Sequence, residues 1–140
     1  MEGMELDLDG TLFPISNAKF ETVYLHSLAQ KLSQYLEPKL LLQSMWEALE
    51  IMINDRSDRF NDEIFYEAFG DRVGSDLVRA LIPKFEEYYA NDFVVLKDHL
   101  DDNQMMVEAI ALLKKKGYRL AIATNPMFPE IAVTQRIAFS

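Results

Sequence analysis

The sequence predicts an α/β fold in which a parallel sheet is interrupted by a long helical insert. Three observations lead to this prediction. A short apolar segment near the N-terminus runs into Asp-Leu-Asp-Gly at positions 7–10, and a second apolar segment, 118–123, ends in Thr-Asn. Between them, apolar residues recur at the three-to-four spacing of amphipathic helices. The order strand, helices, strand, helix is the beginning of a right-handed parallel α/β unit interrupted by a lid.

The first strand ends in two carboxylates, Asp7 and Asp9, whose spacing suits a shared ligand. Residues i and i+2 of an extended segment project to the same side. Asp7 is the candidate nucleophile and metal ligand for attack on phosphorus, with a hard cation such as Mg²⁺ to screen the repulsion. Asp9 is the candidate that protonates the leaving oxygen and then takes a proton from water. Gly10 would let the backbone approach a phosphate closely. The alternative is a plain polar turn, because Asp and Gly are the commonest turn residues.

The insert is expected to contain four helices, whose limits follow from caps and helix breakers. The first is capped by Ser16 and has an apolar stripe from Phe20 to Leu36, and the second runs from Pro38 to Met52. The third is capped by Asn61 and ended by Gly70. The fourth runs from Ser75 to Tyr89 and is kinked near Pro83.

Two further helices flank the second strand. Asp101 and Gln104 have the spacing of a capping box that begins an amphipathic helix, so we interpret Asp101 and Asp102 as structural. The basic run at 114–116 lies in the last turn of that helix, where cations complement the helix dipole and Gly117 ends the helix. A last helix is expected over 129–139.

Both strand ends resemble motifs of one protein family. Asp-Leu-Asp-Gly-Thr-Leu-Phe at 7–13 resembles the first motif, DxDGT(L/V), of the haloacid dehalogenase-like (HAD) superfamily of hydrolases. The strand that ends in Thr124 and Asn125 is similar to the second motif. The resemblance implies a HAD-like Rossmannoid parallel sheet, of which two strands are visible, with an α-helical C1-type cap. It implies a partial core formed by 1–13 and 98–140 and a cap formed by 14–97.

The resemblance also implies roles for individual residues. Asp7 would be the nucleophile that forms a phosphoaspartate, and Asp9 the general acid/base whose backbone carbonyl also ligates Mg²⁺. Both would be metal ligands. Phosphate-binding residues would be Gly10, Thr11, Thr124 and Asn125. The carboxylate at Asp9 favours a phosphatase over a dehalogenase, since family members that cleave carbon–halogen bonds lack it.

The chain departs from the family pattern in two places. Glu5 stands in the first strand where an aliphatic residue is usual, so we expect this strand to be short, frayed at its start or partly exposed. The third motif, a lysine, and the fourth motif, acidic metal ligands, lie downstream in the family. Glu130 and Arg136 are the only charged side chains after Asn125, and neither has the usual spacing. Either the sequence is part of a longer hydrolase, or it is a shortened relative whose chemistry is lost or completed by another chain.

Composition restricts the partners. The formal charge of −9 argues against nucleic acid, whose binding rests on clustered Lys and Arg. No apolar run approaches the roughly 20 residues that cross a bilayer, no secretory signal is visible, and cysteine is absent. A cytoplasmic location is therefore expected. A sheet of two strands would leave an open edge, which a second copy of the chain can cover as a homodimer.

Three functions are compatible with these features. The first is a Mg²⁺-dependent hydrolase of small phosphorylated metabolites, inactive or impaired as this 140-residue chain. The second is a non-catalytic helical binding or oligomerisation domain derived from such a hydrolase. The third is a haloacid dehalogenase, which the carboxylate of Asp9 disfavours.

Overall fold

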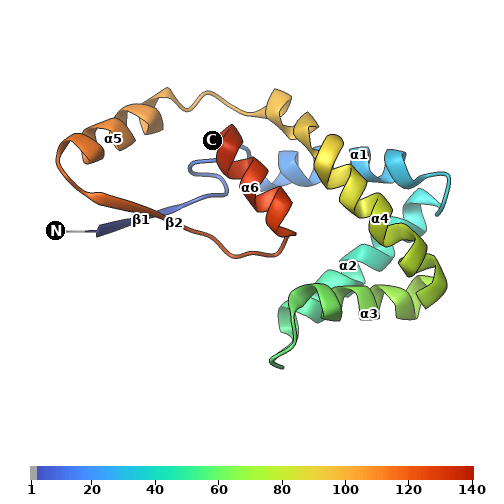
Figure 1. The fold of residues 1–140 in the computed structure, drawn as a ribbon. Coiled ribbons are helices and arrows are strands. Elements are labelled where there is room, and N and C mark those ends of the chain that lie inside the picture. The colour runs from blue at the N-terminus through green and yellow to red at the C-terminus, as the bar shows by residue number, and fades with distance from the viewer. Residues whose placement is uncertain (1–2) are drawn as a thin grey trace. The chain divides into compact units, whose positions relative to one another are not determined.

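The computed structural model of the protein describes residues 3–140. Their architecture is mostly helical α/β, as expected, with six α-helices, one 3-10 helix and one two-stranded parallel sheet (Figure 1). The elements are, in order, β1 (Gly3–Asp7), α1 (Asn17–Leu32), α2 (Pro38–Asn54), α3 (Asn61–Val73), α4 (Ser75–Asn91), η1 (Phe93–His99), α5 (Gln104–Lys115), β2 (Arg119–Ala123) and α6 (Glu130–Phe139). No helix in this described part is long and apolar enough to cross a membrane.

The chain divides into two compact units. The first comprises the chain up to Val23 together with Val94–Ser140, and the second is Tyr24–Phe93. The boundary therefore falls inside α1. The division into a 1–13 and 98–140 core with a 14–97 cap, which the family resemblance implies, stays a prediction.

The sheet belongs to the first unit. Strand β1 pairs with β2 in parallel, from Gly3 opposite Arg119 to Asp7 opposite Ala123, so the carboxyl ends of both strands meet at one edge (Figure 1). Most residues of both strands are exposed, Glu5 among them. The expectation of a partly exposed first strand is confirmed. Because Glu5 lies in solvent, its carboxylate carries no burial cost.

The second unit has a helical core. Helix α2 packs against α3, and α3 packs against α4. Their apolar stripes, with that of the second half of α1, bury a set of large side chains that includes Leu28, Leu32, Leu41, Phe69, Leu81, Phe85 and Tyr88. A polar contact lies within this core, where the Tyr24 and Tyr89 hydroxyls are 2.7 Å apart. Buried phenols need such partners, because an unpaired buried hydroxyl costs free energy.

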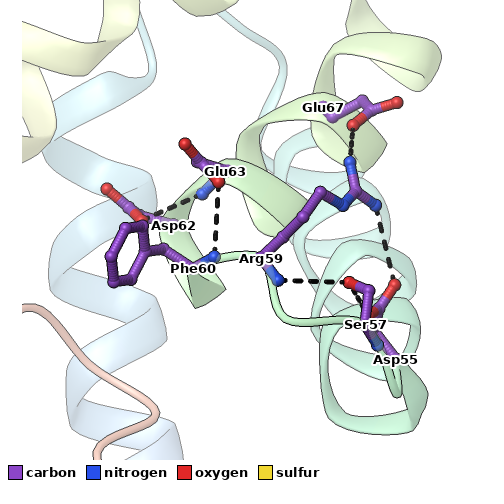
Figure 2. Close-up of polar contacts among 7 residues, drawn as sticks. All are labelled: Asp55, Ser57, Arg59, Phe60, Asp62, Glu63 and Glu67. Carbon is purple, nitrogen blue, oxygen red and sulfur yellow. Dashed lines mark hydrogen bonds and ion pairs between the residues drawn. The ribbon is translucent and has the colours of Figure 1, made fainter.

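The turn between α2 and α3 is fixed by short-range polar contacts, which Figure 2 shows. The Asp55 carboxylate accepts a hydrogen bond from the backbone N–H of Ser57 at 2.7 Å. The guanidinium of Arg59 forms ion pairs with Asp55 and Glu67, so it links the end of α2 to α3. These contacts fit the turn-forming sequence Asn-Asp-Arg-Ser at positions 54–57, which interrupts the helical pattern here.

Helix α3 differs from its expected limits at both ends. Asn61 is the first helical residue, and Phe60 is the N-cap. The Phe60 N–H donates a hydrogen bond to the Glu63 carboxylate at 3.3 Å (Figure 2). Gly70 does not end the helix, which continues to Val73. Gly74 ends it, with a φ of 97° that side-chain-bearing residues rarely adopt.

The expected starts of α1 and α2 are confirmed. The Ser16 hydroxyl accepts a hydrogen bond from the backbone of Lys19 at 3.3 Å, and Pro38 opens α2. The apolar stripe expected to continue to Leu36 leaves the helix earlier, because α1 ends at Leu32. The Leu32 carbonyl then accepts hydrogen bonds from the N–H groups of the following turn.

Candidate functional site

The loop after β1 holds its polar residues at the surface by burying apolar ones. Leu8 and Phe13 are fully buried, and the Phe13 N–H donates to the Leu8 carbonyl at 2.8 Å. The Gly10 N–H donates to the Phe13 carbonyl at 3.0 Å. Gly10 has a φ of 77°, the left-handed conformation that glycine adopts without a steric penalty. The loop is therefore a compact turn anchored by its apolar side chains.

Asp7 is the last residue of β1 and its side chain is exposed. The Thr11 hydroxyl donates a hydrogen bond to its Oδ2 at 3.2 Å. Thr11 lies on the other side of the Gly10 turn, so the turn brings the hydroxyl back to the carboxylate. One oxygen of the candidate nucleophile is held in this way.

Thr124 and Asn125 directly follow β2. Since Ala123 is paired with Asp7, Thr124 enters the loop region at the same sheet edge. Its hydroxyl donates to Oδ2 of Asp9 at 3.4 Å, which is long for a hydroxyl–carboxylate hydrogen bond. Asn125 is exposed, and among the described residues no hydrogen bond joins its side chain to Asp7 or Asp9. The structure thus brings Thr124, but not the Asn125 side chain, to a predicted carboxylate.

Arg136, for which the sequence pattern predicts no role, lies at this site. It belongs to α6, is only 2% exposed, and its Nη1 forms an ion pair with Oδ1 of Asp9. Its guanidinium carbon lies 5.0 Å from the centre of the Phe128 ring, within the range of a cation–π interaction. The sequence holds one indication of this burial: Arg136 is four residues after Ala132, so the two share the buried face of α6.

Asn103 ties the loop to the start of α5. Its Nδ2 donates to the Thr11 carbonyl at 3.0 Å and reaches the Leu12 carbonyl at 3.4 Å. Asn103 also occupies the N-cap position of α5, although its side chain makes no capping hydrogen bond. The side chain is used instead to satisfy loop carbonyls that would otherwise lack a donor.

The expected capping box at Asp101 is wrong. Helix α5 begins at Gln104 with Asn103 as its N-cap, so Asp101 is too far from the helix to cap it. The Asp101 carboxylate pairs with Lys19 at 2.9 Å, and its N–H donates to the Pro14 carbonyl at 2.8 Å. Its role is structural, as expected, but by a different contact.

Comparisons with known proteins give no match: no protein-family model, curated protein or solved structure matches the chain. The HAD resemblance therefore stays a prediction that rests on positions 7–13 and 118–125. Within residues 3–140, no group of three or more His, Cys, Asp or Glu side chains is arranged to hold a metal ion.

Proposed function

We propose that this chain carries the nucleophile, the acid/base and part of the phosphate site of a Mg²⁺-dependent, HAD-like hydrolase of small phosphorylated metabolites. The observation that carries the proposal is the parallel pairing of β1 with β2, with Asp7 opposite Ala123. This pairing supports a common site for the two motif-like segments, because ligands of parallel α/β sheets bind beyond the carboxyl ends of the strands. In this proposal the sheet is the start of a Rossmannoid core and the helices of Tyr24–Phe93 form a C1-type cap.

The proposed reaction has two steps. In the first, a carboxylate oxygen of Asp7 attacks phosphorus, and the bond from phosphorus to the leaving oxygen breaks. Asp9, which is ionised in its pair with Arg136 and takes up a proton as the substrate binds, gives that proton to the leaving oxygen. In the second, water attacks the phosphoaspartate, Asp9 takes back a proton, and the bond between phosphorus and the Asp7 oxygen breaks. The products are the alcohol and inorganic phosphate, and both carboxyl groups return to their starting states.

The oxygen donors at the site suit magnesium. Mg²⁺ is commonly held by one or two carboxylates, with water and phosphate oxygens in its other positions. Asp7 offers an exposed carboxylate whose only hydrogen bond within the described residues comes from Thr11, and the main-chain carbonyl of Asp9 is the second proposed ligand. When bound, the ion would neutralise charge on the phosphoryl oxygens and on the attacking carboxylate.

The test is phosphorylation of Asp7 together with hydrolysis. The purified 140-residue chain is incubated with p-nitrophenyl phosphate, with and without Mg²⁺. Product release is followed, and acid-quenched samples are digested and analysed by mass spectrometry. We expect slow, Mg²⁺-dependent turnover and a phosphoryl adduct on the peptide that contains Asp7, both abolished by Asp7→Asn. Slow turnover is expected because the third and fourth motif residues are absent from this sequence.

The matched control is Asp98→Asn, which removes the same charge from an exposed residue of the first unit. It should hydrolyse the ester at the wild-type rate. Turnover that survives Asp7→Asn would assign the reaction to another group. Absence of both turnover and adduct in the wild-type chain would contradict the proposal.

A second candidate is a non-catalytic binding or oligomerisation module, which the surface of α5 favours. None of the residues of α5 is buried, and Met105, Val107 and Leu112 are exposed, Met105 at 86%. Exposed apolar surface of this kind favours association. A defined oligomer in light scattering, without any adduct on Asp7, would support this candidate. The homodimer through the open sheet edge stays a prediction that the same measurement tests.

A further inference from the structure

Two donor nitrogens of the Arg136 guanidinium have no acceptor at the site among the described residues. Arg136 is 2% exposed, and only its Nη1 is used, in the ion pair with Asp9. Its Nε and Nη2 are buried and have no hydrogen-bond partner among the described residues. Folded proteins satisfy nearly all their buried donors, so a buried guanidinium with two free donors needs an explanation. A ligand that supplies the missing acceptors is such an explanation.

The geometry of the guanidinium limits the kind of ligand. The N–H bonds of Nε and Nη2 on one edge are parallel and form a fork, which matches two oxygens of one phosphoryl or carboxylate group. Asp9 binds the third nitrogen, so the ion pair leaves this fork intact. The Phe128 ring engages the guanidinium through its π face and uses no N–H donor.

The charge of Arg136 also favours an anionic ligand. Asp7 and Asp9 carry two negative charges, which repel an anionic substrate. The guanidinium is a permanent positive charge next to Asp9, and burial strengthens its attraction for an anion. The Thr124 hydroxyl approaches the other oxygen of the same Asp9 carboxylate. The donor fork and the hydroxyl therefore both lie beside the Asp9 carboxylate. The single O–H of Thr124 donates to a phosphoryl oxygen only when it leaves its long contact with Asp9.

We infer that Arg136 and Thr124 form an oxyanion site that binds the phosphoryl group of the substrate, with the Nε and Nη2 fork of Arg136 as its cationic part. This inference rests on the proposed function and adds to it a source of positive charge within the chain. Phe128, whose ring meets Phe20 edge to face at 5.5 Å, holds the guanidinium in place.

The experiment uses inorganic phosphate and the full 140-residue chain. Calorimetry measures phosphate affinity, and NMR follows the ¹⁵Nε–¹Hε signals of the arginine side chains during the same titration. We expect phosphate to shift the Arg136 Nε signal. Arg136→Lys keeps the charge but loses the fork, so phosphate affinity should fall at least tenfold, and Thr124→Val should weaken binding to a lesser degree.

The control variant is Arg79→Lys, which makes the same change at a side chain that is 74% exposed. It should bind phosphate as the wild type does, and the Arg79 signal should not move. The inference is overturned if the wild type does not bind phosphate at millimolar concentration, or if binding leaves the Arg136 signal unmoved. Unchanged affinity in a folded Arg136→Lys variant would also overturn it. If that variant fails to fold, the wild-type NMR titration decides.

These outcomes are separate from those that test the hydrolase. Phosphate binding through Arg136 without any adduct on Asp7 would leave the oxyanion site standing and remove the proposed reaction. An adduct on Asp7 whose formation is the same in Arg136→Lys and in wild type would leave the reaction standing and remove Arg136 from it.

Discussion

The ion pair between Asp9 and Arg136 joins two side chains with very different access to water. The Asp9 side chain is 38% exposed, whereas that of Arg136 is 2% exposed. If the pair is broken, an aspartate left alone can be hydrated, but an arginine left alone stays buried as an uncompensated charge. Removing the aspartate should therefore lower the free energy of unfolding by a different amount from removing the arginine.

We predict that Asp9→Asn destabilises the protein more than Arg136→Met does. Asp9→Asn should lower the free energy of unfolding by about 2–3 kcal/mol, a value reduced from that of a fully buried pair because Asp9 is partly exposed. Arg136→Met removes the charge and keeps a long apolar side chain, so its cost should be about 1 kcal/mol. Urea unfolding of both variants measures the difference. Equal losses would mean that the guanidinium is hydrated after all.

A second prediction concerns the backbone of Gly10. Its φ of 77° disfavours any residue with a Cβ. Space is not limiting, because the nearest atom to an added Cβ would be the Ile15 carbonyl oxygen at 4.0 Å, which is an ordinary contact. The cost of Gly10→Ala is thus conformational, about 1–2 kcal/mol. Gly10→Asn should cost less, because asparagine tolerates this conformation. Urea midpoints of the two variants give the comparison, and a larger loss for Asn would indicate a steric cause instead.

The sequence predicts part of this site, for a physical reason. Residues that follow parallel strands meet at one sheet edge, so the sequence alone places Asp9 and Thr124 close together, as the structure has them. Arg136 could not be assigned in the same way. Its contact with Asp9 depends on how α6 packs against the loop. The sequence gives only a weak indication of that packing, namely that Arg136 shares a helix face with Ala132.

At the scale of elements, buried tyrosines make the stability of the second unit, Tyr24–Phe93 (the helical unit), depend on pH in the alkaline range. Burial raises the pKa of Tyr88 to about 12, and burial with the nearby Glu86 raises that of Tyr66 to about 12. In the unfolded chain these phenols ionise near pH 10. The unfolded state therefore loses protons first as the pH rises, and the folded state is disfavoured.

We predict that the helical unit keeps its full stability below about pH 10 and loses it progressively between about pH 10 and 12. The fluorescence of Trp46, the single tryptophan, reports on α2 during urea unfolding at each pH. Tyr66→Phe removes one of the two ionisable phenols, so the free energy of unfolding should fall less steeply with pH, by on the order of 1 kcal/mol per pH unit. A urea midpoint that does not change from pH 9 to 11 would contradict the prediction.

Element limits were predictable where a local rule decides them, and not elsewhere. Ser16 and Pro38 act through their own chemistry, and both confirm the expected helix starts. Gly70 has ordinary helical backbone, and an added Cβ there would meet Val78 of α4 at 3.7 Å. Such a distance is an ordinary contact, so Gly70 lies inside α3 without any steric requirement for glycine. Only tertiary structure distinguishes it from Gly74, which ends the helix.

At the scale of the whole molecule, the two units differ in how much of their secondary structure is covered. Helices α2, α3 and α4 each bury several side chains in the helical core. By contrast, α5 buries none, and both strands are mostly exposed. Local opening costs less free energy where little apolar surface is buried, so the units should open independently and at different rates.

Amide hydrogen exchange should therefore be slow in α2 and α4 and faster in α5 and β2. We expect protection in α4 to approach the global free energy of unfolding, because α4 buries Leu81 and Phe85 in the core. Leu81→Ala leaves a cavity and should cost about 2–5 kcal/mol. It should speed exchange in α2, α3 and α4 together, while the already fast exchange of α5 should hardly change. A matched substitution, Leu112→Ala on the exposed face of α5, should leave exchange in the helical unit unaltered. If Leu81→Ala instead accelerates exchange equally in every element, the chain unfolds as one cooperative body and the division into two units has no energetic meaning.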